Sequence, residues 1–511
     1  MLANLIVGTN IEARKPKKLA RKTLGIALFL LFFLQNATCL ASSAVNNDNR
    51  RVLSTSKNGG HSKSFFFDGS NGSVSDYRNQ REHRYLGSLV NKVESVIRST
   101  FLPSGYPNRT PSGYLKYAAW SWVQDISTQL RSVLATQRVL EGVGVGREGA
   151  TALSALMNYL VRDGCGMAAS LLFTSAASSR FRTDIKRWRL FADLMVDLGI
   201  TLEVTAVLVP RVLFLPMISI GNMCKAMCGV AAGACGGSIN LHWAKGSDIS
   251  DINAKFGAQH TVTGALGLIF AALFARSVSH VNSFRLWIVY SSLTLLHIIA
   301  NMQCMRIIAF DSCNTVRMNL LFAEFFPWWE KNALSTSPGS EPPAMSNPVK
   351  IAKTEPLFFG VPGKYRKPPS DIPIHFGGTF NEFWERSGKS LAQFENEIFQ
   401  NNKDNYIISS GWTKHERLPC VVVSFLSQVT PLQEAKAYFH ANLLGNELQT
   451  SIAKSGSKTI DDVRRLEAEG DAGKQLDIAW GEFQTSCKAA GWDLSKTELR
   501  TKGYEVEFMT S

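Results

Sequence analysis

The sequence has little formal charge: Asp, Glu, Lys and Arg make up 19% of its 511 residues, whereas 45% are hydrophobic. This balance excludes a disordered protein, because the chain can bury a large core, and its length allows two or three domains. Residues 1–100 hold 15 basic and 6 acidic residues, residues 101–325 hold 19 and 12, and the remainder 21 and 23. No nucleic-acid-binding module accompanies the basic excess, so we expect no nucleic-acid partner.

Patterns for a metal or a dinucleotide are also missing. Cys224, Cys228 and Cys235 lie in one small-residue segment, without a second close cysteine pair or a nearby histidine pair. Their spacing favours small packing residues over a zinc site, so we expect no metal. The glycines of residues 142–146 close a helical pattern, whereas a Rossmann loop follows a strand and opens a helix. Dinucleotide binding is therefore not expected.

The N-terminus has the composition of a targeting segment. Basic residues between positions 14 and 22 precede the apolar run 24–34, and small residues follow at 37, 39 and 41. We interpret residues 1–41 as a signal peptide or signal anchor. Residues 42–84, whose first part is rich in Ser, Asn and Gly, form a transit-like segment that we expect to be disordered. Together they predict a plastid membrane reached through the secretory route, with the endoplasmic reticulum or another endomembrane as the alternative.

Residues 85–333 have the pattern of a helical core. Three runs lack formal charge over 19, 19 and 20 residues, at positions 226–244, 257–275 and 286–305. At 1.5 Å per residue each reaches about 30 Å, enough to cross a bilayer. Gly229, Gly233 and Gly237, at four-residue spacing, predict a ribbon for close helix packing. The fold class is therefore mainly α with a membrane-associated core; a soluble bundle with buried central helices is the alternative.

One helix, predicted over residues 184–198, carries an unusual set of charges. Its apolar residues recur at three- and four-residue steps, while Lys186, Arg189, Asp193 and Asp197 share another face. These charges are either a solvated face with an Arg189–Asp193 pair or a buried polar network that includes Arg162 or Asp163. Three histidines in the apolar runs are likewise either hydrogen-bonded structural groups or members of a metal or proton-relay site. They are His242, His260 and His297.

Several motifs in one order are similar to the root UVB sensitive family. They are FLPSGYP at 101–107, VLATQRVLEGVGVG at 133–146, RDG at 162–164, KRWRLFADLMVD at 186–197, HWA at 242–244, DINAK at 251–255 with Gln259, and LHIIANMQCMRIIAFDSCNTVR at 296–317. The resemblance implies an organellar, membrane-associated protein that acts with a second family member in early development and in light or pyridoxal phosphate homeostasis. It implies no established catalytic residues. The candidate polar site comprises Arg162, Asp163, Lys186, Arg189, Asp193, Asp197, His242, Asp251, Lys255, Gln259, His297, Asn301 and Arg306.

The C-terminal part changes in composition. Residues 334–375, rich in Pro, Ser and Lys, predict a surface linker, and residues 376–511 predict a small α+β domain. Strands are expected at 406–409, 421–425 and 504–508, and helices at 432–444 and 475–489. The domain shows no nucleophile and base at catalytic spacing, which favours an interaction or regulatory module.

We therefore expect a non-enzymatic, membrane-associated plastid protein of the root UVB sensitive type. A small-molecule transporter is one alternative, because apolar helices with glycines and internal polar residues are typical of transporters. An enzyme that uses pyridoxal phosphate is the other, with Lys186 or Lys255 as the imine-forming amine. Neither lysine follows a phosphate-binding glycine loop, so the cofactor is the least supported expectation.

Overall fold

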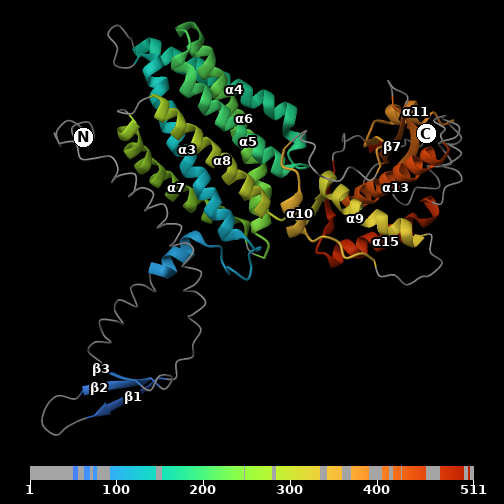
Figure 1. Cartoon of the computed structure of the whole chain (residues 1–511), viewed down its shortest axis with the longest axis horizontal. Helices are drawn as coiled ribbons and strands as arrows, with labels where there is room; N and C mark the ends of the chain where they lie inside the picture. The colour runs from blue at the N-terminus through green and yellow to red at the C-terminus, as the bar shows by residue number, and fades with distance from the viewer. Residues whose placement is uncertain are drawn as a thin grey trace, which may run out of the picture. The chain divides into compact units, whose positions relative to one another are not determined.

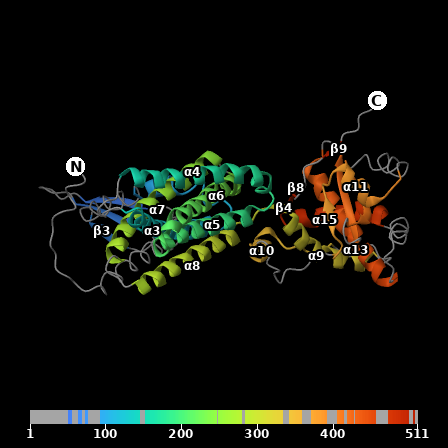
Figure 2. The same ribbon diagram turned by 90° about the horizontal axis from the view of Figure 1, so that it is seen from above.

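Six long helices account for most of residues 114–307 in the computed structural model (Figures 1 and 2). Apolar residues at three- and four-residue steps give each helix a face to bury. Two short 3-10 turns, η2 Ser178–Arg180 and η3 Ala206–Leu208, lie between them. The helices are α3 Tyr114–Val143, α4 Ala152–Ala177, α5 Ile185–Thr205, α6 Arg211–Trp243, α7 Ile249–Val278 and α8 Ser283–Ile307.

The chain divides into two units, residues 1–103 and residues 104–511. The signal segment, residues 1–41, lies outside the described residues. The structure describes residues 50–55, 63–68, 73–76, 93–144, 152–246, 248–278, 283–333, 342–358, 370–390, 405–413, 418–426, 429–455, 472–499 and 505–506.

In the first unit, residues 93–101 are helical, within the helix expected to begin near residue 85. The same unit contains an antiparallel sheet of β1 Arg50–Thr55, β2 Lys63–Asp68 and β3 Ser73–Asp76. No regular structure was expected over residues 42–84. Val52 of β1 pairs with Phe66 of β2, and Phe67 of β2 pairs with Val74 of β3. These β-branched and aromatic residues are ones that favour strands.

The helices α3 and α5 occupy the centre of the bundle. α3 packs against α5, α7 and α8, whereas α5 packs against α6, which in turn carries α4. Trp243 at the end of α6 lies against Tyr114 at the start of α3, with ring centroids 5.6 Å apart. A Cβ on Gly113 would meet Ile307, the last residue of α8, at 2.9 Å. The start of α3 and the ends of α6 and α8 therefore share one end of the bundle.

Helix α3 ends where the glycine pattern predicted. Gly144 caps it in the left-handed conformation, with φ of 99°, and its N–H bonds the carbonyls of Leu140 and Glu141. Glycine adopts this conformation without the steric cost that a Cβ adds. The expectation that these glycines stop a helix is confirmed at this position.

The outer surface of the bundle is apolar. Helices α6, α7 and α8 contain segments long and apolar enough to cross a membrane, yet only 28%, 22% and 33% of the respective windows are buried. Leu268, Ile288 and Leu295 are among the residues that face outward from α7 and α8. The expected apolar runs are thus confirmed as candidate spans by length and composition. The apolar helices are therefore not the buried centre of the bundle, because α3 and α5 lie there and carry the charges.

The predicted glycine ribbon is wrong. A Cβ on Gly229, Gly233 or Gly237 would meet no atom within 4 Å, so these glycines face open space. The close contact instead joins Gly199 of α5 to Gly221 of α6. A Cβ on Gly199 would lie 2.5 Å from the carbonyl oxygen of Gly221, and one on Gly221 would lie 2.9 Å from that of Gly199. Spacing along one helix did not reveal which face meets a neighbour.

A mixed sheet lies between two helices in the C-terminal part (Figure 2). β7 Pro419–Leu426 pairs with β6 Tyr406–Trp412 antiparallel, and with β5 Ile374–Phe376 and β9 Glu505–Val506 in parallel. Alternate β7 side chains pack towards α13 Pro431–Ser455 or towards α11 Phe380–Ser387. Both faces of β7 are buried, as its continuous apolar run requires. The expected strands and the helix at 432–444 are confirmed: β6, β7 and α13 extend beyond the expected bounds, and β9 covers residues 505–506 of the strand expected at 504–508.

A second C-terminal core includes residues that the sequence assigned to the helical core. In α9 Thr315–Ala333, Phe322 and Phe325 pack with Phe439 of α13 and Phe483 of α15 Ala472–Ala489. β4 Ser312–Asn314 pairs in parallel with β8 Asp493–Glu498. The boundary expected at residue 333 therefore differs from the packing, which joins α9 to the C-terminal domain. The apolar pattern of α9 identified a helix without identifying its neighbour.

The expected linker also contains ordered, buried structure. α10 Pro348–Thr354 begins at Asn347, whose side chain accepts a hydrogen bond from Lys350 N. Met345, Ile351 and Glu355 are buried. A linker running wholly over the surface is therefore wrong for residues 345–357. The Pro and Ser content indicated a helix start and turns rather than exposure.

Candidate functional site

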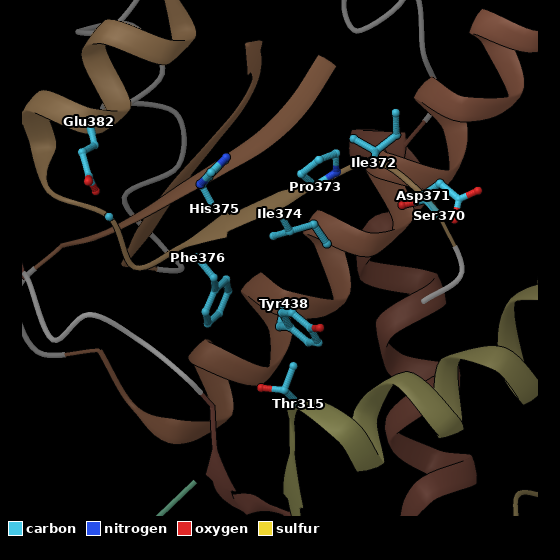
Figure 3. A pocket seen from close by; sticks show the side chains of 11 residues that line it. Thr315, Ser370, Asp371, Ile372, Pro373, Ile374, His375, Phe376, Glu382 and Tyr438 are labelled. Atoms are coloured by element: carbon cyan, nitrogen blue, oxygen red, sulfur yellow. The ribbon is translucent and has the colours of Figure 1, made fainter. Parts of the chain in front are cut away.

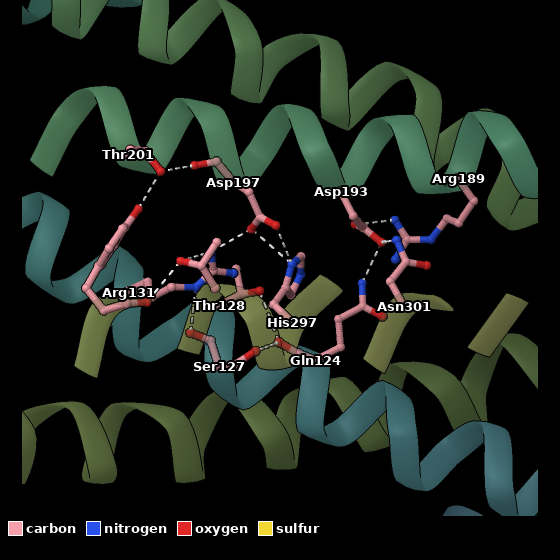
Figure 4. A network of polar contacts seen from close by, with 12 residues as sticks. Gln124, Ser127, Thr128, Arg131, Arg189, Asp193, Asp197, Thr201, His297 and Asn301 are labelled. Atoms are coloured by element: carbon pink, nitrogen blue, oxygen red, sulfur yellow. Dashed lines mark hydrogen bonds and ion pairs between the residues drawn. The ribbon is translucent and has the colours of Figure 1, made fainter. Parts of the chain in front are cut away.

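The charged face of α5 is buried. Asp193 and Asp197 are each 5% exposed, and Lys186 is 2% exposed. The solvated-face alternative therefore does not hold, because α3 and α8 cover the carboxylates (Figure 4). Burial of ions at this depth requires partners for each charge.

Asp193 is held by three side chains from three helices. Arg189 Nη1, one turn earlier on α5, lies 2.9 Å from its Oδ1. Gln124 of α3 donates to Oδ2 over 2.7 Å, and the amide of Asn301 on α8 donates to the same oxygen. Gln124 and Asn301 supply hydrogen bonds without adding charge, so Arg189 alone neutralises this carboxylate among the contacting groups.

Asp197 joins α3, α5 and α8 through an ion pair and a histidine. Arg131 Nη1 lies 2.5 Å from Oδ1, and the Arg131 side chain has no exposed surface. His297 Nδ1 lies 2.9 Å from the same carboxylate. An ionised carboxylate only accepts hydrogen bonds, so Nδ1 carries the proton in this contact. Two carboxylates and two guanidinium groups thus balance at the centre of the bundle, and His297 can add one charge.

Hydroxyl groups extend this network. Thr201 bonds the backbone carbonyl of Asp197 over 2.6 Å, and its oxygen lies 2.7 Å from that of Tyr290. Thr294 accepts a long contact of 3.4 Å from Arg131. The centre of the bundle is therefore a continuous chain of polar groups from three helices, of a kind that can relay a proton.

A separate cluster holds the two charges of the RDG motif. Arg162 of α4 lies 2.9 Å from Glu203 of α5, and Lys225 of α6 lies 2.5 Å from the same oxygen. Asp163 accepts a hydrogen bond from Asn222 of α6 over 3.3 Å. The expectation that Arg162 or Asp163 joins the Asp193 network is wrong, because Arg162 pairs with Glu203, which lies about three turns beyond Asp193 along α5.

Lys186 belongs to a third cluster at the start of α5. Its Nζ lies 2.9 Å from Glu355, which also lies 3.0 Å from Arg317. Burial by itself would raise the pKa of Glu355, but Arg317 and Lys186 outweigh it and lower that pKa to about 2. His242 lies nearby, with its ring centroid 5.2 Å from that of Phe310. These contacts tie the helical core to Glu355, the residue that follows α10.

The remaining candidates lie elsewhere. Asp251 bonds Ser104 N over 2.7 Å and pairs with Lys255 over 3.2 Å. Gln259 donates to the hydroxyl of Tyr114 over 3.0 Å. Arg306 is exposed. The thirteen sequence candidates thus divide into four groups, and only Arg189, Asp193, Asp197, His297 and Asn301 share the central network.

The surroundings of the two candidate lysines do not fit pyridoxal phosphate. Lys186 Nζ is buried against Glu355 and lies 6.0 Å from the centre of the Phe310 ring. Lys255 pairs with Asp251 on its own helix. An imine forms on an unpaired amine with room for the cofactor ring, whereas each of these amines is paired with a carboxylate. Within the described ranges, no group of three or more His, Cys, Asp and Glu residues could hold a metal ion.

Sequence reasoning missed the contribution of α3. Gln124, Ser127 and Arg131 are buried polar residues, and each has a hydrogen bond. Their three- and four-residue spacing places them on one face of a helix. That periodicity is the signal that could have identified the face, and the apolar residues of the same helix obscured it.

The fold and the site together define a class: a helical bundle with charges in its interior and apolar side chains on its exterior. Residues 88–327 match a family described as "Vitamin B6 photo-protection and homoeostasis domain", and residues 344–508 match "Root UVB sensitive protein, C-terminal". The chain therefore belongs to the root UVB sensitive family.

Curated relatives are similar over about half of this chain. "RUS family member 1" of Dictyostelium discoideum is 30% identical over 52% of this chain and 48% of its own length. "Protein root UVB sensitive 3" of Arabidopsis thaliana is 32% identical over 46% and 53%. "Protein root UVB sensitive 2, chloroplastic" of the same plant is 34% identical over 46% and 52%. The chain spans about half the length of these relatives. No solved structure matches it.

Proposed function

We propose that this protein is embedded in a plastid membrane, where it acts without enzymatic activity in vitamin B6 photo-protection and homoeostasis. We further propose that it works in a complex with a second root UVB sensitive family member in light response and early development. The description of the matched family supports the vitamin B6 role. The chloroplastic name of one relative supports the plastid.

The observation that carries the membrane proposal is the inverted distribution of polarity. Arg131, Asp193 and Asp197 are buried, while Leu268 and Ile269 of α7 are 62% and 59% exposed. Water would favour the opposite arrangement, because exposed apolar area is unfavourable and buried ions lose hydration. Lipid favours what is seen: apolar side chains outside and paired polar groups inside.

Alkaline carbonate extraction tests this proposal. We expect the full-length protein to stay in the membrane pellet at high pH and to enter solution only with detergent. A peripheral protein of the same organelle serves as the control that is released. Complete release of this protein by carbonate would contradict membrane embedding.

Localisation is tested separately with residues 1–84 fused to a fluorescent protein. We expect plastid fluorescence together with cleavage near residue 41, because basic, apolar and small-residue segments follow one another there. Retention in the endoplasmic reticulum or secretion of the fusion would contradict the plastid assignment. N-terminal sequencing of the mature protein reports the cleavage site.

A second candidate function is proton-linked transport of a small molecule. It is favoured by the Asp197–His297 contact, because intramembrane ionisable residues commonly form proton relays. Vesicles containing the purified protein would be loaded with a pH dye and supplied with pyridoxine outside. Coupled alkalinisation or acidification that His297→Gln abolishes would support transport. No dye response in either protein would leave the non-transporting role as the supported function.

A further inference from the structure

Helix α4 has an apolar outer face that the three candidate spans do not include. Six of its large residues are between 61% and 74% exposed. Over its 26 residues only two carry a charge, and both lie in the middle of the helix. The exposed residues are Leu153, Leu156, Leu160, Met167, Leu171 and Leu172.

The two charges of α4 differ in exposure: the Arg162 side chain lies against its neighbours, whereas that of Asp163 is 54% exposed. Arg162 is 17% exposed and bonds Glu203, whose side chain is 4% exposed. Asp163 lies 3.7 Å from Arg162 and accepts a hydrogen bond from Asn222 of α6. Hydropathy counts these two residues against a membrane span, but Glu203 pairs with Arg162 inside the bundle, and Arg162 and Asn222 contact the exposed Asp163 carboxylate. The outward face of α4 therefore continues the apolar exterior of α6.

α4 and α5 are, like α6, long enough to cross a bilayer, and both pack along α6. At 1.5 Å per residue the 26 residues of α4 extend about 39 Å and the 21 of α5 about 31 Å, against a hydrocarbon core of roughly 30 Å. Both helices pack along α6 (Figures 1 and 2). If α6 crosses a bilayer, two helices of this length beside it lie in the same layer.

We propose that the outer face of α4 contacts lipid acyl chains and that all six helices, α3 to α8, cross the membrane. This inference rests on the proposed membrane embedding. It goes beyond that proposal by giving the number of membrane crossings and the side of the membrane on which each end of the bundle lies. An even number of crossings places the start of α3 and the C-terminal domain on the same side of the membrane. Crossing by α6, α7 and α8 alone would place them on opposite sides.

Contacts at one end of the bundle agree with six crossings. The backbone N–H of Ser104 bonds Asp251 at the start of α7 over 2.7 Å. Gly113, before α3, lies against Ile307 at the end of α8. Lys245, after α6, pairs with Asp311 over 2.5 Å. Segments that precede α3 and follow α8 thus meet on one side, which three crossings would separate by the bilayer.

Labelling of single engineered cysteines in sealed organelle vesicles tests the sidedness. Asn108→Cys lies before α3, Arg211→Cys lies at the first residue of α6, and Lys350→Cys lies in α10; all three positions are exposed. Each full-length variant is treated with a membrane-impermeant maleimide before and after detergent. The unsubstituted protein gives the background from native cysteines, and carbonate-resistant variants are the ones compared.

Six crossings predict that positions 108 and 350 react alike and position 211 reacts oppositely. If positions 108 and 211 react alike and position 350 oppositely, three crossings are present and this inference is overturned while membrane embedding stands. If all three react without detergent, the bilayer separates none of these positions and six crossings are overturned, whereas release by carbonate is the result that contradicts membrane embedding. Other patterns also overturn six crossings.

Lipid contact by α4 is tested with a fluorophore on Leu171→Cys and nitroxide-labelled lipids. We expect quenching as strong as at Leu268→Cys of α7, an exposed position on a candidate span. Ala231→Cys, at a buried position of α6, is the unquenched control. Quenching at position 268 without quenching at 171 would mean that another protein surface covers α4, and would overturn the lipid contact.

Discussion

Arg131 and Asp197 form a buried ion pair that joins the two central helices, α3 and α5, with 2.5 Å between Nη1 and Oδ1. The Arg131 side chain is completely enclosed, so its charge depends on this partner. Asp193, one turn away, repeats the arrangement with Arg189. These ion pairs hold the core of the bundle together, so a substitution that removes one of the charges should lower the stability of the protein.

Removal of one ion should be more damaging than removal of a pair. Asp193→Asn should lower the free energy of unfolding by about 3–5 kcal/mol, because it leaves Arg189 without its counter-charge in a buried setting. Arg189→Met in the same chain should partly restore stability, with a coupling above about 1.5 kcal/mol. Thermal unfolding of the four proteins in detergent measures this cycle.

The control for that cycle is Glu141→Gln. Glu141 pairs with Arg138 over 2.9 Å at the protein surface, where its side chain is 43% exposed. Its loss should change stability by less than about 1 kcal/mol. Additive effects of the Asp193 and Arg189 substitutions, each as small as the control, would show that the network does not stabilise the bundle.

Two glycine substitutions on α6 should have opposite effects. Gly221→Ala should destabilise the protein by about 1–3 kcal/mol, because its Cβ would lie 2.9 Å from the backbone oxygen of Gly199. Gly233→Ala meets open space and should be neutral or stabilising by up to about 1 kcal/mol through helix propensity. Melting temperatures in one detergent compare them. Equal losses of stability at both positions would show that Gly233 also contacts another helix, as the predicted glycine ribbon requires.

Acid should remove the contribution of Glu355. Its pKa is about 2 in the folded protein and 4.5 ordinarily, so the unfolded chain binds the proton first as pH falls. The stabilisation is therefore complete above pH 4.5 and disappears as pH falls towards 2; it is on the order of 3 kcal/mol. Unfolding of wild type and Glu355→Gln is compared from pH 7 to 2. We expect their difference to shrink over this window, and a constant difference would contradict the assignment.

The C-terminal domain should require α9. A fragment of residues 308–511 should unfold cooperatively, whereas one of residues 334–511 should not, because it lacks Phe322 and Phe325 from the core around Phe439. Loss of a buried aromatic side chain typically costs about 3–5 kcal/mol, and the shorter fragment loses several. Calorimetry distinguishes the two. Cooperative unfolding of the shorter fragment would restore the boundary at residue 333.

Local features were predictable from the sequence because they depend on neighbouring residues. The stripe of apolar residues identified α5, and Gly144 ended α3 as its flexibility allows. The three candidate spans followed from composition, and the motifs between residues 101 and 317 indicated the family. A continuous apolar run likewise indicated β7.

The orientation of each face was not predictable in the same way. Gly233 and Gly221 look alike in sequence, yet only Gly221 meets another helix. Arg162 lowers the hydropathy of α4 although its guanidinium points to Glu203. Hydropathy reports what a helix contains, whereas burial depends on the direction in which each side chain points.

The sequence by itself determined the helix that became α5, the end of α3 at Gly144, the apolar runs and the family. Only the tertiary structure decided which charges meet: Arg131 and Asp197 are 66 positions apart, and Asp193 and Asn301 are 108 apart. Periodicity acts over one or two turns of a helix and contains no information on the neighbouring helix. A charge is stable in the interior only with a partner at short distance. The packing of α3, α5 and α8 therefore determines which charges pair.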